Sequence, residues 1–399
     1  MYDVAVIGGG PIGSRVAYRL SEMGRRVVVM EQKESLGEPV CCTGIISQKC
    51  LEQFEIDKRV VYRQANRAKV FSPSAKLISL RRQKPQACIV DRAAFNVSLA
   101  RRAQDEGAEY LLNSPVTNVK VGDGGVTIES GRQPGELDRF EAKAVVVAGG
   151  SGSKLVDELG LGRVGDFTIG VQAEVETNGL DEVEVYLGRQ TAPAFFAWLV
   201  PTSHRRALAG LLSRRRSGFY LNKLVSSLAA QGKIVSTEVK PSYAKVPLKP
   251  LARTYSDRII VVGSAAGQVK PTTGGGIYFG LMCADIAADH LQQALEDDHL
   301  SAKHLSNYEK AWKKKLTGEL RAADWGRKFF ALLSDRQIDR VFDIMKTNGV
   351  DEALLKADDL SFDWPGKAVL RIMGHRALSR TVETIKLPLP PGRVGRGRS

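Results

Sequence analysis

The chain has 399 residues, of which 43% are hydrophobic and 26% are charged. This composition is typical of a folded globular protein, and the length predicts two or three packed units rather than one core. No apolar run reaches the roughly 18 residues needed to cross a bilayer, and no leader precedes the first expected strand. Five scattered cysteines indicate neither a disulfide framework nor a zinc site. We therefore expect a cytoplasmic protein in a reducing compartment.

The formal net charge is +14, and it is spread along the chain rather than gathered in one recognition helix. The basic runs are Arg81-Arg82, Arg205-Arg206, Arg214-Arg215-Arg216, Lys313-Lys314-Lys315 and the tail residues Arg393, Arg396 and Arg398. No zinc-finger or RNA-recognition signature accompanies them, so no nucleic-acid partner is expected. A solvated basic surface and attraction to an anionic membrane or phospholipid both remain open. The five histidines lack metal-ligand spacing, so no metal site is expected.

The most informative segment is the N-terminal one, where an apolar strand runs into a glycine turn and then a helix. Gly8, Gly10 and Gly13 have G-x-G-x-x-G spacing, which suits a tight turn, a close backbone approach to a pyrophosphate and close helix packing. A second apolar run over 27–30 ends at Glu31, where an acid would accept hydrogen bonds from a ribose. The segment predicts binding of an ADP-containing dinucleotide. The cofactor contacts expected here are Gly8, Gly10, Pro11, Ile12, Gly13, Glu31 and Gln32.

The first half of the chain alternates strand and helix signals. The expected helices cover 14–24, the later part of 37–60, and 92–106, and the expected strands cover 88–90, 110–121, 126–129 and 144–148. The run Ala144-Val145-Val146-Val147-Ala148 is fully apolar, as in a buried parallel strand. It ends in a second glycine-rich exit at 149–152.

The middle of the chain changes to alternating apolar and polar positions, which favours antiparallel strands. We expect strands over 170–176, 183–188, 195–201 and 207–212 and a helix over 219–231. A buried parallel strand returns at 259–263, followed by a helix over 277–295 and mainly helices beyond 301. The expected domain ranges are 1–164 and 256–300 for a dinucleotide-binding domain, 165–255 for an inserted substrate domain, 301–387 for a helical region and 388–399 for a disordered basic tail.

Three glycine-rich strand exits, at 8–13, 149–152 and 263–267, together with Gly274-Gly275-Gly276 before a helix, indicate one long cofactor held from end to end. That pattern favours FAD over NAD. A helix N-terminus beside the flavin ring would stabilise negative charge on it. The remaining contacts expected for FAD from this pattern are Val116, Ala148, Gly149, Gly263, Ser264, Gly274, Gly275, Gly276 and Ile277.

Over residues 1–345 the chain resembles the geranylgeranyl reductases, within the para-hydroxybenzoate hydroxylase-like FAD enzymes. The resemblance rests on the N-terminal fingerprint and on further segments. These are Asp91-Arg92-x-x-Phe95, Gly263-Ser264-Ala265-Ala266-Gly267 with Pro271-x-x-Gly274-Gly275-Gly276-Ile277, Glu38-Pro39-Val40-Cys41-Cys42-Thr43-Gly44, and Pro193-x-x-Phe196-x-Trp198-x-Val200-Pro201. It implies an α/β (α+β overall) fold: a Rossmann-like FAD-binding domain with an inserted antiparallel-sheet substrate domain and a helical C-terminal region.

The resemblance also implies an activity, namely saturation of C=C bonds of an isoprenoid chain by hydride transfer from reduced flavin. Phe195, Phe196 and Trp198 would line the isoprenoid tunnel, and Cys42 would position the substrate or relay a proton. The resemblance also implies that Cys42, Thr43, Gly44 and Arg92 contact FAD. Electrons would come from NAD(P)H or a reduced redox protein. We also expect a monomer, and the basic surface favours peripheral attachment to the inner face of an anionic membrane that carries the lipid substrate.

The sequence departs from the family pattern at three positions. Ser264 stands where the family has an acid, Phe196 replaces a Tyr and Val200 replaces a Phe. A shorter hydroxyl at Ser264 predicts weaker contact with the flavin's ribityl chain. Phe196 cannot donate a phenolic proton, so only its tunnel role survives.

Several alternatives remain open at this stage. Cys42 is also explained as an inert buried thiol, Phe196 and Trp198 as core, and Arg92 as a helix-surface residue. The aromatic residues between Trp325 and Met345 fit packing against the protein's own core or a membrane-facing helix. A flavin monooxygenase or halogenase of the same fold, and a non-catalytic flavin- or lipid-binding protein, are the rival functions.

Overall fold

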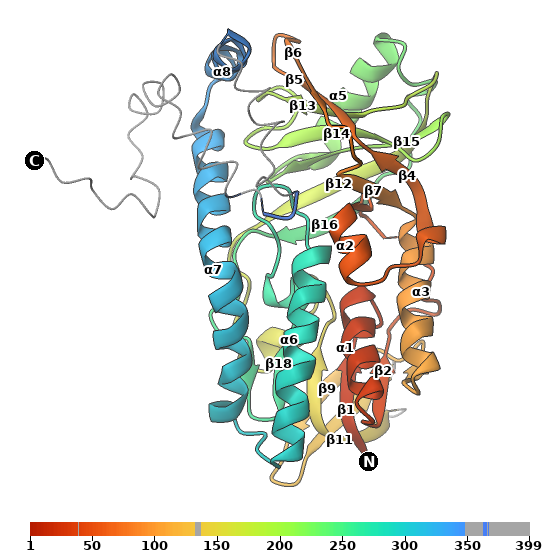
Figure 1. Ribbon diagram of the computed structural model, residues 1–399, viewed down its shortest axis with the longest axis vertical. Coiled ribbons are helices and arrows are strands. Elements are labelled where there is room, and N and C mark those ends of the chain that lie inside the picture. Colours follow the sequence, from red (N-terminus) through yellow and green to blue (C-terminus); the bar gives the residue numbers. More distant parts are fainter. Residues whose placement is uncertain (39, 132–136, 348–361, 365, 367–399) are drawn as a thin grey trace, which may run out of the picture.

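The computed structural model describes residues 1–38, 40–131, 137–347, 362–364 and 366. The predicted basic tail, 388–399, lies outside these residues, as does Pro39. The described chain is built from two large sheets and a small one, with helices along the first sheet and over the second (Figure 1). The predicted α/β class with an antiparallel second sheet is confirmed.

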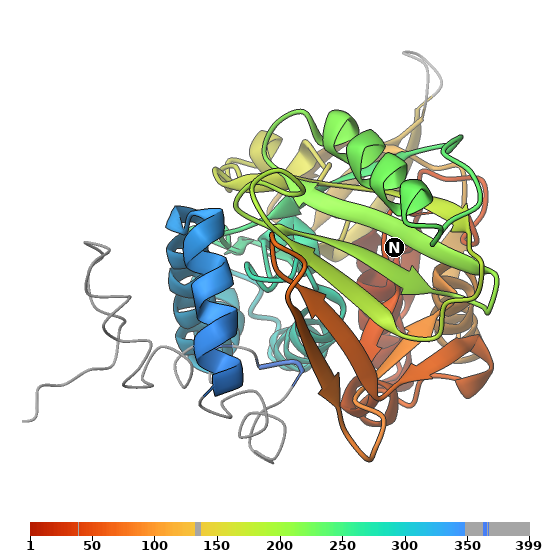
Figure 2. The same ribbon diagram turned by 90° about the horizontal axis from the view of Figure 1, so that it is seen from above.

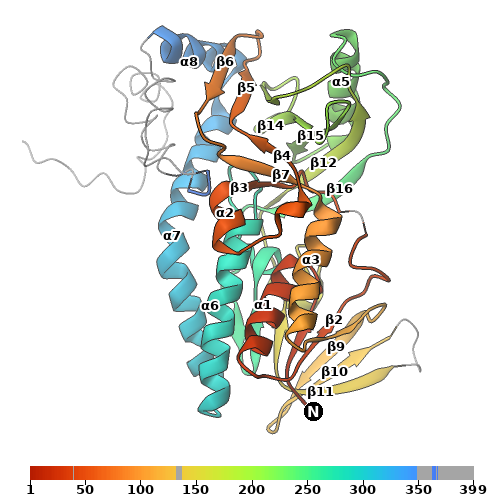
Figure 3. The same cartoon turned by 45° about the vertical axis from the view of Figure 1, so that its right-hand side comes forward.

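The first sheet has a parallel core of five strands in the order β18 (Ile259–Val261), β11 (Asp138–Val147), β1 (Tyr2–Ile7), β2 (Val27–Met30) and β8 (Glu109–Leu111). The short β17 (Tyr255–Ser256) pairs antiparallel with β18, and β9 (Val116–Val121) and β10 (Val126–Ser130) extend antiparallel from β11. Figure 3 shows this extension at the end of the molecule far from the second sheet. The parallel order brings the carboxyl ends of β1, β11 and β18 together at one edge.

Helices α1 (Pro11–Glu22), α3 (Arg92–Asp105), α6 (Ile277–Glu296) and α7 (Ala302–Leu332) pack along the first sheet. Alternate strand residues such as Val4 and Val6 face these helices, where they meet Leu20, Phe95 and Phe279 in one buried cluster. The opposite face buries the other alternate residues, Ala5 and Ile7 among them. Burial on both faces explains why these strands read as continuous apolar runs.

The second sheet has seven strands. Their order is β16 (Ser242–Pro247), β12 (Phe167–Glu176), β15 (Arg206–Ser213), β14 (Phe196–Pro201), β13 (Val183–Leu187), β5 (Arg67–Phe71) and β6 (Leu77–Arg81). All neighbours are antiparallel except β13 and β5. Helix α5 (Ser217–Ala230) covers one face, as the view from above shows (Figure 2). Strands β3 (Ile45–Ser47), β7 (Ala87–Val90) and β4 (Val61–Ala65) form the small sheet beside α2 (Gln48–Gln53).

The short elements that remain are α4 (Leu155–Glu158), α8 (Asp335–Thr347) and two 3-10 turns, Lys58–Val60 and Gly263–Ala266. Among the described residues, no helix is both long enough and apolar enough to cross a bilayer.

Two of the differences from the sequence-based expectations concern the arrangement of strands in the sheets. The segment 1–164 is not confined to the first sheet, because β5 and β6 pair with the edge of β13 in the second. The single strand expected over 110–121 is two strands in different parts of the sheet. The chain breaks at Asn113, whose φ of 55° lies in the left-handed region and ends a strand.

The aromatic run near the C-terminal end of the described helices packs inside the protein. Trp325 is 9% exposed. Phe329, Leu333, Ile338 and Phe342 share one buried cluster with Ile78 of β6. The core interpretation of these residues is therefore correct, and the alternative of a membrane-facing helix is wrong for them.

Candidate functional site

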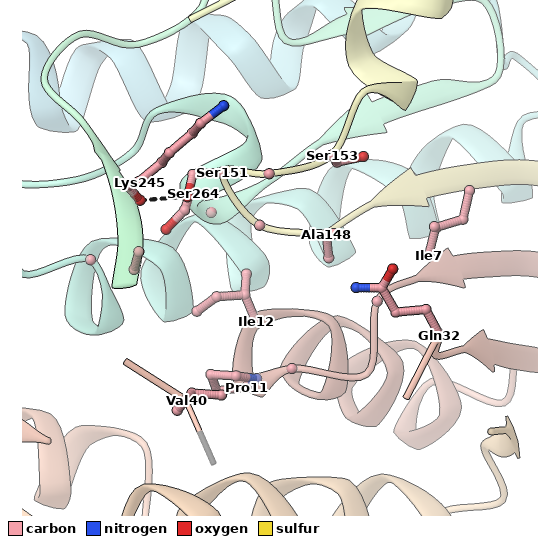
Figure 4. A pocket seen from close by; sticks show the side chains of 18 of the residues that line it. Ile7, Pro11, Ile12, Gln32, Val40, Ala148, Ser151, Ser153, Lys245 and Ser264 are labelled. Atoms are coloured by element: carbon pink, nitrogen blue, oxygen red, sulfur yellow. Dashed lines mark hydrogen bonds between the residues drawn. The ribbon is translucent and has the colours of Figure 1, made fainter. Parts of the chain in front are cut away.

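One pocket of about 1010 Å³ lies where the parallel strands of the first sheet end and meet the second sheet. Its wall comes from the loops after β1, β2, β11 and β18, from the segment before α6 and from β16 (Figure 4). Ligand pockets span about 300–1,000 Å³, so this volume suits a ligand as large as a dinucleotide. Carboxyl ends of parallel strands are also where open α/β sheets bind nucleotides.

The glycine turn after β1 is fixed by close backbone contacts. Gly8 has φ of 108°, and a Cβ there would lie 2.7 Å from the carbonyl oxygen of Ala148. A Cβ at Gly13 would lie 1.9 Å from the carbonyl oxygen of Gly8. A Cβ at Gly10 would meet nothing within 4 Å, so the pocket floor is open there. Helix α1 starts at Pro11 without a side-chain cap, which leaves its first N–H groups free for a phosphate.

Glu31 holds the next loop in place. Its side chain is buried at 8% exposure, and its two oxygens accept hydrogen bonds from the N–H of Gly9 at 2.7 Å and of Lys33 at 3.1 Å. Each oxygen keeps a second lone pair, so the carboxylate retains acceptor capacity for a hydroxyl. Gln32 and Val116 line the same end of the pocket.

The opposite end is formed by Gly263, Ser264 and the segment before α6. Gly263 and Gly274 have φ of 67° and 73°, and a Cβ at Gly263 would lie 3.2 Å from the side chain of Ile12. Helix α6 begins at Ile277 without a side-chain cap, so its N–H groups face the pocket between Gly276 and Ser264. The helix spans 20 residues, and its N-terminus favours an anion.

Arg92 is the pocket residue whose buried side-chain nitrogens lack hydrogen-bond acceptors in the described part of the chain. Its Nε and Nη1 are buried and have no hydrogen-bond partner among the described residues, although the side chain lines the pocket. The guanidinium carbon lies 4.8 Å from the ring centroid of Phe95. Asp91 holds the backbone at this point because it caps α3 through the N–H of Ala93 and Ala94. A buried guanidinium normally finds an acceptor, so the pocket fits a ligand that brings oxygens.

The cysteine loop borders the pocket with both of its thiols. Cys41 points its Sγ at the carbonyl oxygens of Ser242 and Gly170, at 3.4 and 3.9 Å, and burial raises the pKa of this thiol. Cys42 lines the pocket beside it. Thr43 and Gly44 do not line it; a Cβ at Gly44 would lie 2.4 Å from the carbonyl oxygen of Val90, so this glycine serves packing against β7.

The aromatic strand of the second sheet lies next to the pocket, not in its wall. Phe195 and Trp198 are 2% and 9% exposed, and the Trp198 ring lies 5.8 Å from that of Phe196. Their apolar cluster reaches the pocket through Val246, which belongs to both. The indole Nε1 of Trp198 is buried without a hydrogen-bond partner in the described chain. Their tunnel role stays a prediction.

Most of the predicted cofactor contacts line the pocket. They are Gly8, Gly10, Pro11, Ile12, Glu31, Gln32, Cys42, Arg92, Val116, Ala148, Gly149, Gly263, Ser264, Gly274, Gly276 and Ile277. Gly13 and Gly275 lie behind its wall and shape the backbone. The described residues hold no cluster of metal-ligating side chains.

A buried ion pair behind the Gly274–Gly276 segment was not predicted from the sequence. Lys270 Nζ lies 3.2 Å from a carboxylate oxygen of Asp363, and the two residues are 4% and 1% exposed. Ser47 donates a hydrogen bond to the same carboxylate. Lys270 also donates its backbone N–H to the carbonyl oxygen of Gly275, so the pair supports the wall of the pocket. The residues are too far apart in the sequence for spacing to reveal this cluster.

A second missed contact closes the pocket between the two sheets. Ser151, in the loop after β11, donates a hydrogen bond from its Oγ to the carbonyl oxygen of Lys245 in β16, at 2.6 Å (Figure 4). Because Ser151 follows a strand of the first sheet and Lys245 lies in the second, this bond ties the second sheet to the loop after β11 at the pocket wall.

The glycine cradle, the uncapped N-termini of α1 and α6 and the Arg92 guanidinium, unpaired among the described residues, together define a dinucleotide-binding protein. A family model described as lycopene cyclase protein matches residues 3–354. A digeranylgeranylglycerophospholipid reductase 2 of Methanothermobacter thermautotrophicus is 31% identical over 85% of this chain and 90% of the relative. A digeranylgeranylglycerophospholipid reductase of Methanocaldococcus jannaschii is 28% identical over 88% and 93%.

The solved structures agree on the fold. A geranylgeranyl bacteriochlorophyll reductase-like protein of Thermoplasma acidophilum superimposes with a TM-score of 0.83 at 23% identity, covering 96% of this chain and 98% of the other. The halogenase PltM in complex with phloroglucinol and FAD has a TM-score of 0.69 at 13% identity, over 97% and 93%. The chain therefore belongs to the FAD-dependent family of the digeranylgeranylglycerophospholipid reductases, as the resemblance in its motifs predicts.

Proposed function

We propose that this protein is a FAD-dependent oxidoreductase that saturates C=C bonds of an isoprenoid chain. The observation that carries the proposal is the single pocket in which three glycine-rich strand exits and two helix N-termini meet, in a chain 31% identical to a protein named for this reduction. That name makes a digeranylgeranylglycerophospholipid the first substrate to test. A geranylgeranyl diphosphate and a prenyl quinone are the further members of the same substrate class.

The pocket's own groups suit FAD along its whole length. The free N–H groups of α1 would hold the pyrophosphate, Glu31 would accept from the adenosine ribose, and the α6 N-terminus would face the ring system. Arg92 would donate its two orphaned N–H groups to cofactor oxygens. Ser264 offers one hydroxyl where the family has an acid. Once reduced, FAD bound there would supply hydride to one carbon of an isolated alkene.

The second alkene carbon needs a proton, and the substrate needs an apolar, dry site. Cys42 is the titratable side chain that the family resemblance assigns here, and it lines the pocket. The cluster of Phe195, Phe196 and Trp198 supplies apolar surface next to it and excludes water. Phe196 lacks a hydroxyl, so it shapes the site without donating a proton.

The electron donor is proposed to be NAD(P)H or a reduced redox protein. The parallel sheet in the described part of the chain provides one dinucleotide cradle, so the donor would bind transiently. We further propose a monomer on the cytoplasmic side, with peripheral attachment to the membrane that carries the lipid.

The proposal is tested by mass. Dithionite-reduced protein is incubated with digeranylgeranylglycerophospholipid, geranylgeranyl diphosphate and a prenyl quinone, and the products are weighed. Reduction adds two hydrogens per alkene, cyclisation leaves the mass unchanged, and oxygenation adds an oxygen atom. Only the first outcome, together with a yellow protein that releases FAD, supports the proposal. Unchanged mass with every substrate overturns it.

A further inference from the structure

A cluster of exposed aromatic and basic side chains stands beside the pocket. It consists of Phe167, Arg216, Phe219, Tyr243 and Lys245, and we refer to it as the aromatic–basic patch. Phe167, Phe219 and Tyr243 are 43%, 51% and 54% exposed. The described chain exposes five large aromatic side chains, so most of its exposed aromatic surface gathers at this one place.

The half of the patch next to α5 is continuous. A Cβ built on Gly218, in the first turn of α5, would lie 3.0 Å from the hydroxyl of Tyr243 in β16. Phe219 follows directly, and the guanidinium carbon of Arg216 lies 4.4 Å from its ring centroid. Two aromatic rings and a cation therefore share the end of α5.

The other half lies on the edge of the second sheet. Tyr243 and Lys245 are two residues apart in β16, so their side chains stand on the same face. The Nζ of Lys245 lies 5.5 Å from the ring centroid of Phe167 in the neighbouring β12. Figure 4 shows the Lys245 side chain directed away from Pro11 and Ile12, the labelled residues of the glycine loop.

The positive charge of the patch is largely unneutralised. Arg215, Arg216 and Lys245 form no salt bridge within the described part of the chain, whereas the adjacent Arg214 pairs with Asp166 at 2.7 Å. The whole chain carries a net charge of +14. The patch therefore presents free cations around half-exposed rings.

The patch also borders the opening of the pocket. Tyr243 and Lys245, both exposed, are part of the pocket wall. Through the bond from Ser151 to Lys245, the same strand is tied to the loop after β11. A molecule resting on the patch is thus adjacent to the cofactor pocket.

We infer that the aromatic–basic patch docks the protein on an anionic lipid bilayer, so that a lipid substrate passes from the bilayer into the pocket. The inference rests on the proposed function, because only a lipid substrate requires this route. A Tyr side chain lies at the headgroup level of a membrane, Phe side chains enter the boundary between headgroups and acyl chains, and basic side chains beside them attract anionic lipids. An acidic protein partner would also use cations and aromatic rings, and the assay below distinguishes it from a bilayer.

The test compares variants that leave the pocket wall intact. Arg215→Gln with Arg216→Gln removes the patch cation Arg216 and the exposed cation next to it in the sequence, and Phe219→Ser removes one ring; none of the three residues lines the pocket. The control pair Arg101→Gln with Lys314→Gln removes two exposed charges from α3 and α7, and Leu332→Ser removes an exposed apolar side chain elsewhere. Binding is measured by co-sedimentation with phosphatidylglycerol vesicles and with phosphatidylcholine vesicles.

We expect the full-length protein to bind phosphatidylglycerol vesicles and not phosphatidylcholine vesicles, with affinity falling as salt is added. Each basic residue near an anionic surface contributes about fivefold to binding, so the double arginine variant should bind about 25-fold more weakly. Both controls should bind like the unmodified protein. Equal binding by patch variants and controls overturns the inference. Loss of turnover with the electron donor but normal vesicle binding would assign the patch to a redox partner and overturn it as well.

The failure of this inference is distinguishable from failure of the proposed function. With detergent-dispersed prenyl phosphate, the patch variants should keep the turnover of the unmodified protein, because no bilayer has to be reached. Absence of prenyl reduction by the unmodified protein, with vesicle binding intact, refutes the function and leaves the docking surface standing.

Discussion

Substitutions of Gly10 and Gly13 by alanine distinguish the contribution of the glycine turn to FAD binding from its contribution to packing. Gly10 has φ of −69° and ψ of 177°, which alanine adopts freely, and its Cβ would enter open space over the pocket floor. Gly13 lies in α1, and its Cβ would fall 1.9 Å from the carbonyl oxygen of Gly8. Gly10→Ala should therefore lose FAD affinity with no loss of stability, and Gly13→Ala should lose both.

The magnitude for Gly13→Ala follows from two opposing effects. Alanine gains about 1 kcal/mol over glycine inside a helix. Overpacking costs about 1–3 kcal/mol and more where the contacted atom cannot move, as is the case for a backbone carbonyl. The contact is far shorter than any real Cβ contact, so the clash dominates and the net loss should be about 2 kcal/mol. For Gly10→Ala, the methyl group occupies the approach of the pyrophosphate, and a lost charge-assisted hydrogen bond of about 1.5–3 kcal/mol weakens FAD binding about 10- to 100-fold.

The assays are urea unfolding of the FAD-free protein and quenching of FAD fluorescence on titration. Gly318→Ala is the matched control, since its Cβ in α7 would meet nothing within 4 Å. It should gain stability and bind FAD normally. Unchanged FAD affinity in Gly10→Ala would refute the assignment of the loop to the pyrophosphate. Full stability in Gly13→Ala would refute the packing argument.

Three other perturbations test the remaining parts of the site. Arg92→Met keeps the packing on Phe95 but removes two donors that have no partner in the described part of the protein. FAD affinity should therefore fall about 10-fold or more, while the melting temperature of the FAD-free protein stays unchanged. Normal FAD affinity would show that Arg92 does not bind the cofactor. Burial lowers the pKa of Lys270 below 10.5, so the unfolded chain binds more protons in the window between the two pKa values, and the free energy of unfolding should rise with pH there. Urea unfolding at a series of pH values checks this, and the double variant Lys270→Met with Asp363→Asn should flatten the rise. Trp198→Phe should lower prenyl turnover while the FAD titration stays unchanged, and equal turnover would reduce Trp198 to a core residue.

The elements that local sequence determines were predictable. The apolar run ending at Val147 is buried on both faces, and it indicated a parallel strand correctly, although β11 starts earlier, at Asp138. The glycine spacing located the cradle because Gly8 and Gly13 belong to one tight turn, in which a Cβ at Gly13 would lie 1.9 Å from the carbonyl oxygen of Gly8. A steric contact between residues a few positions apart leaves a spacing pattern in the sequence, so the turn could be predicted from that pattern.

Long-range pairing was not predictable from spacing. The β5–β6 hairpin reads like any exposed hairpin, and only the open edge of β13, more than 100 residues away, decides where it pairs. The ion pair of Lys270 and Asp363 has the same character, since each residue alone looks like a surface charge. Trp198 shows a third limit, because a strand pattern indicates that a ring is buried and leaves open whether it faces a pocket.

The chain visits the second sheet twice, first with β5 and β6 and again from β12 to β16. The sheet therefore has no single pair of junctions at which it can be cut out and expressed alone. Cleavage in the loop between β11 and β12 would leave the two halves held by strand pairing rather than release a fragment. Because the chain crosses between the two sheets several times, no single hinge connects them. Opening of the pocket must therefore come from movement of its loops and not from rotation of one sheet relative to the other.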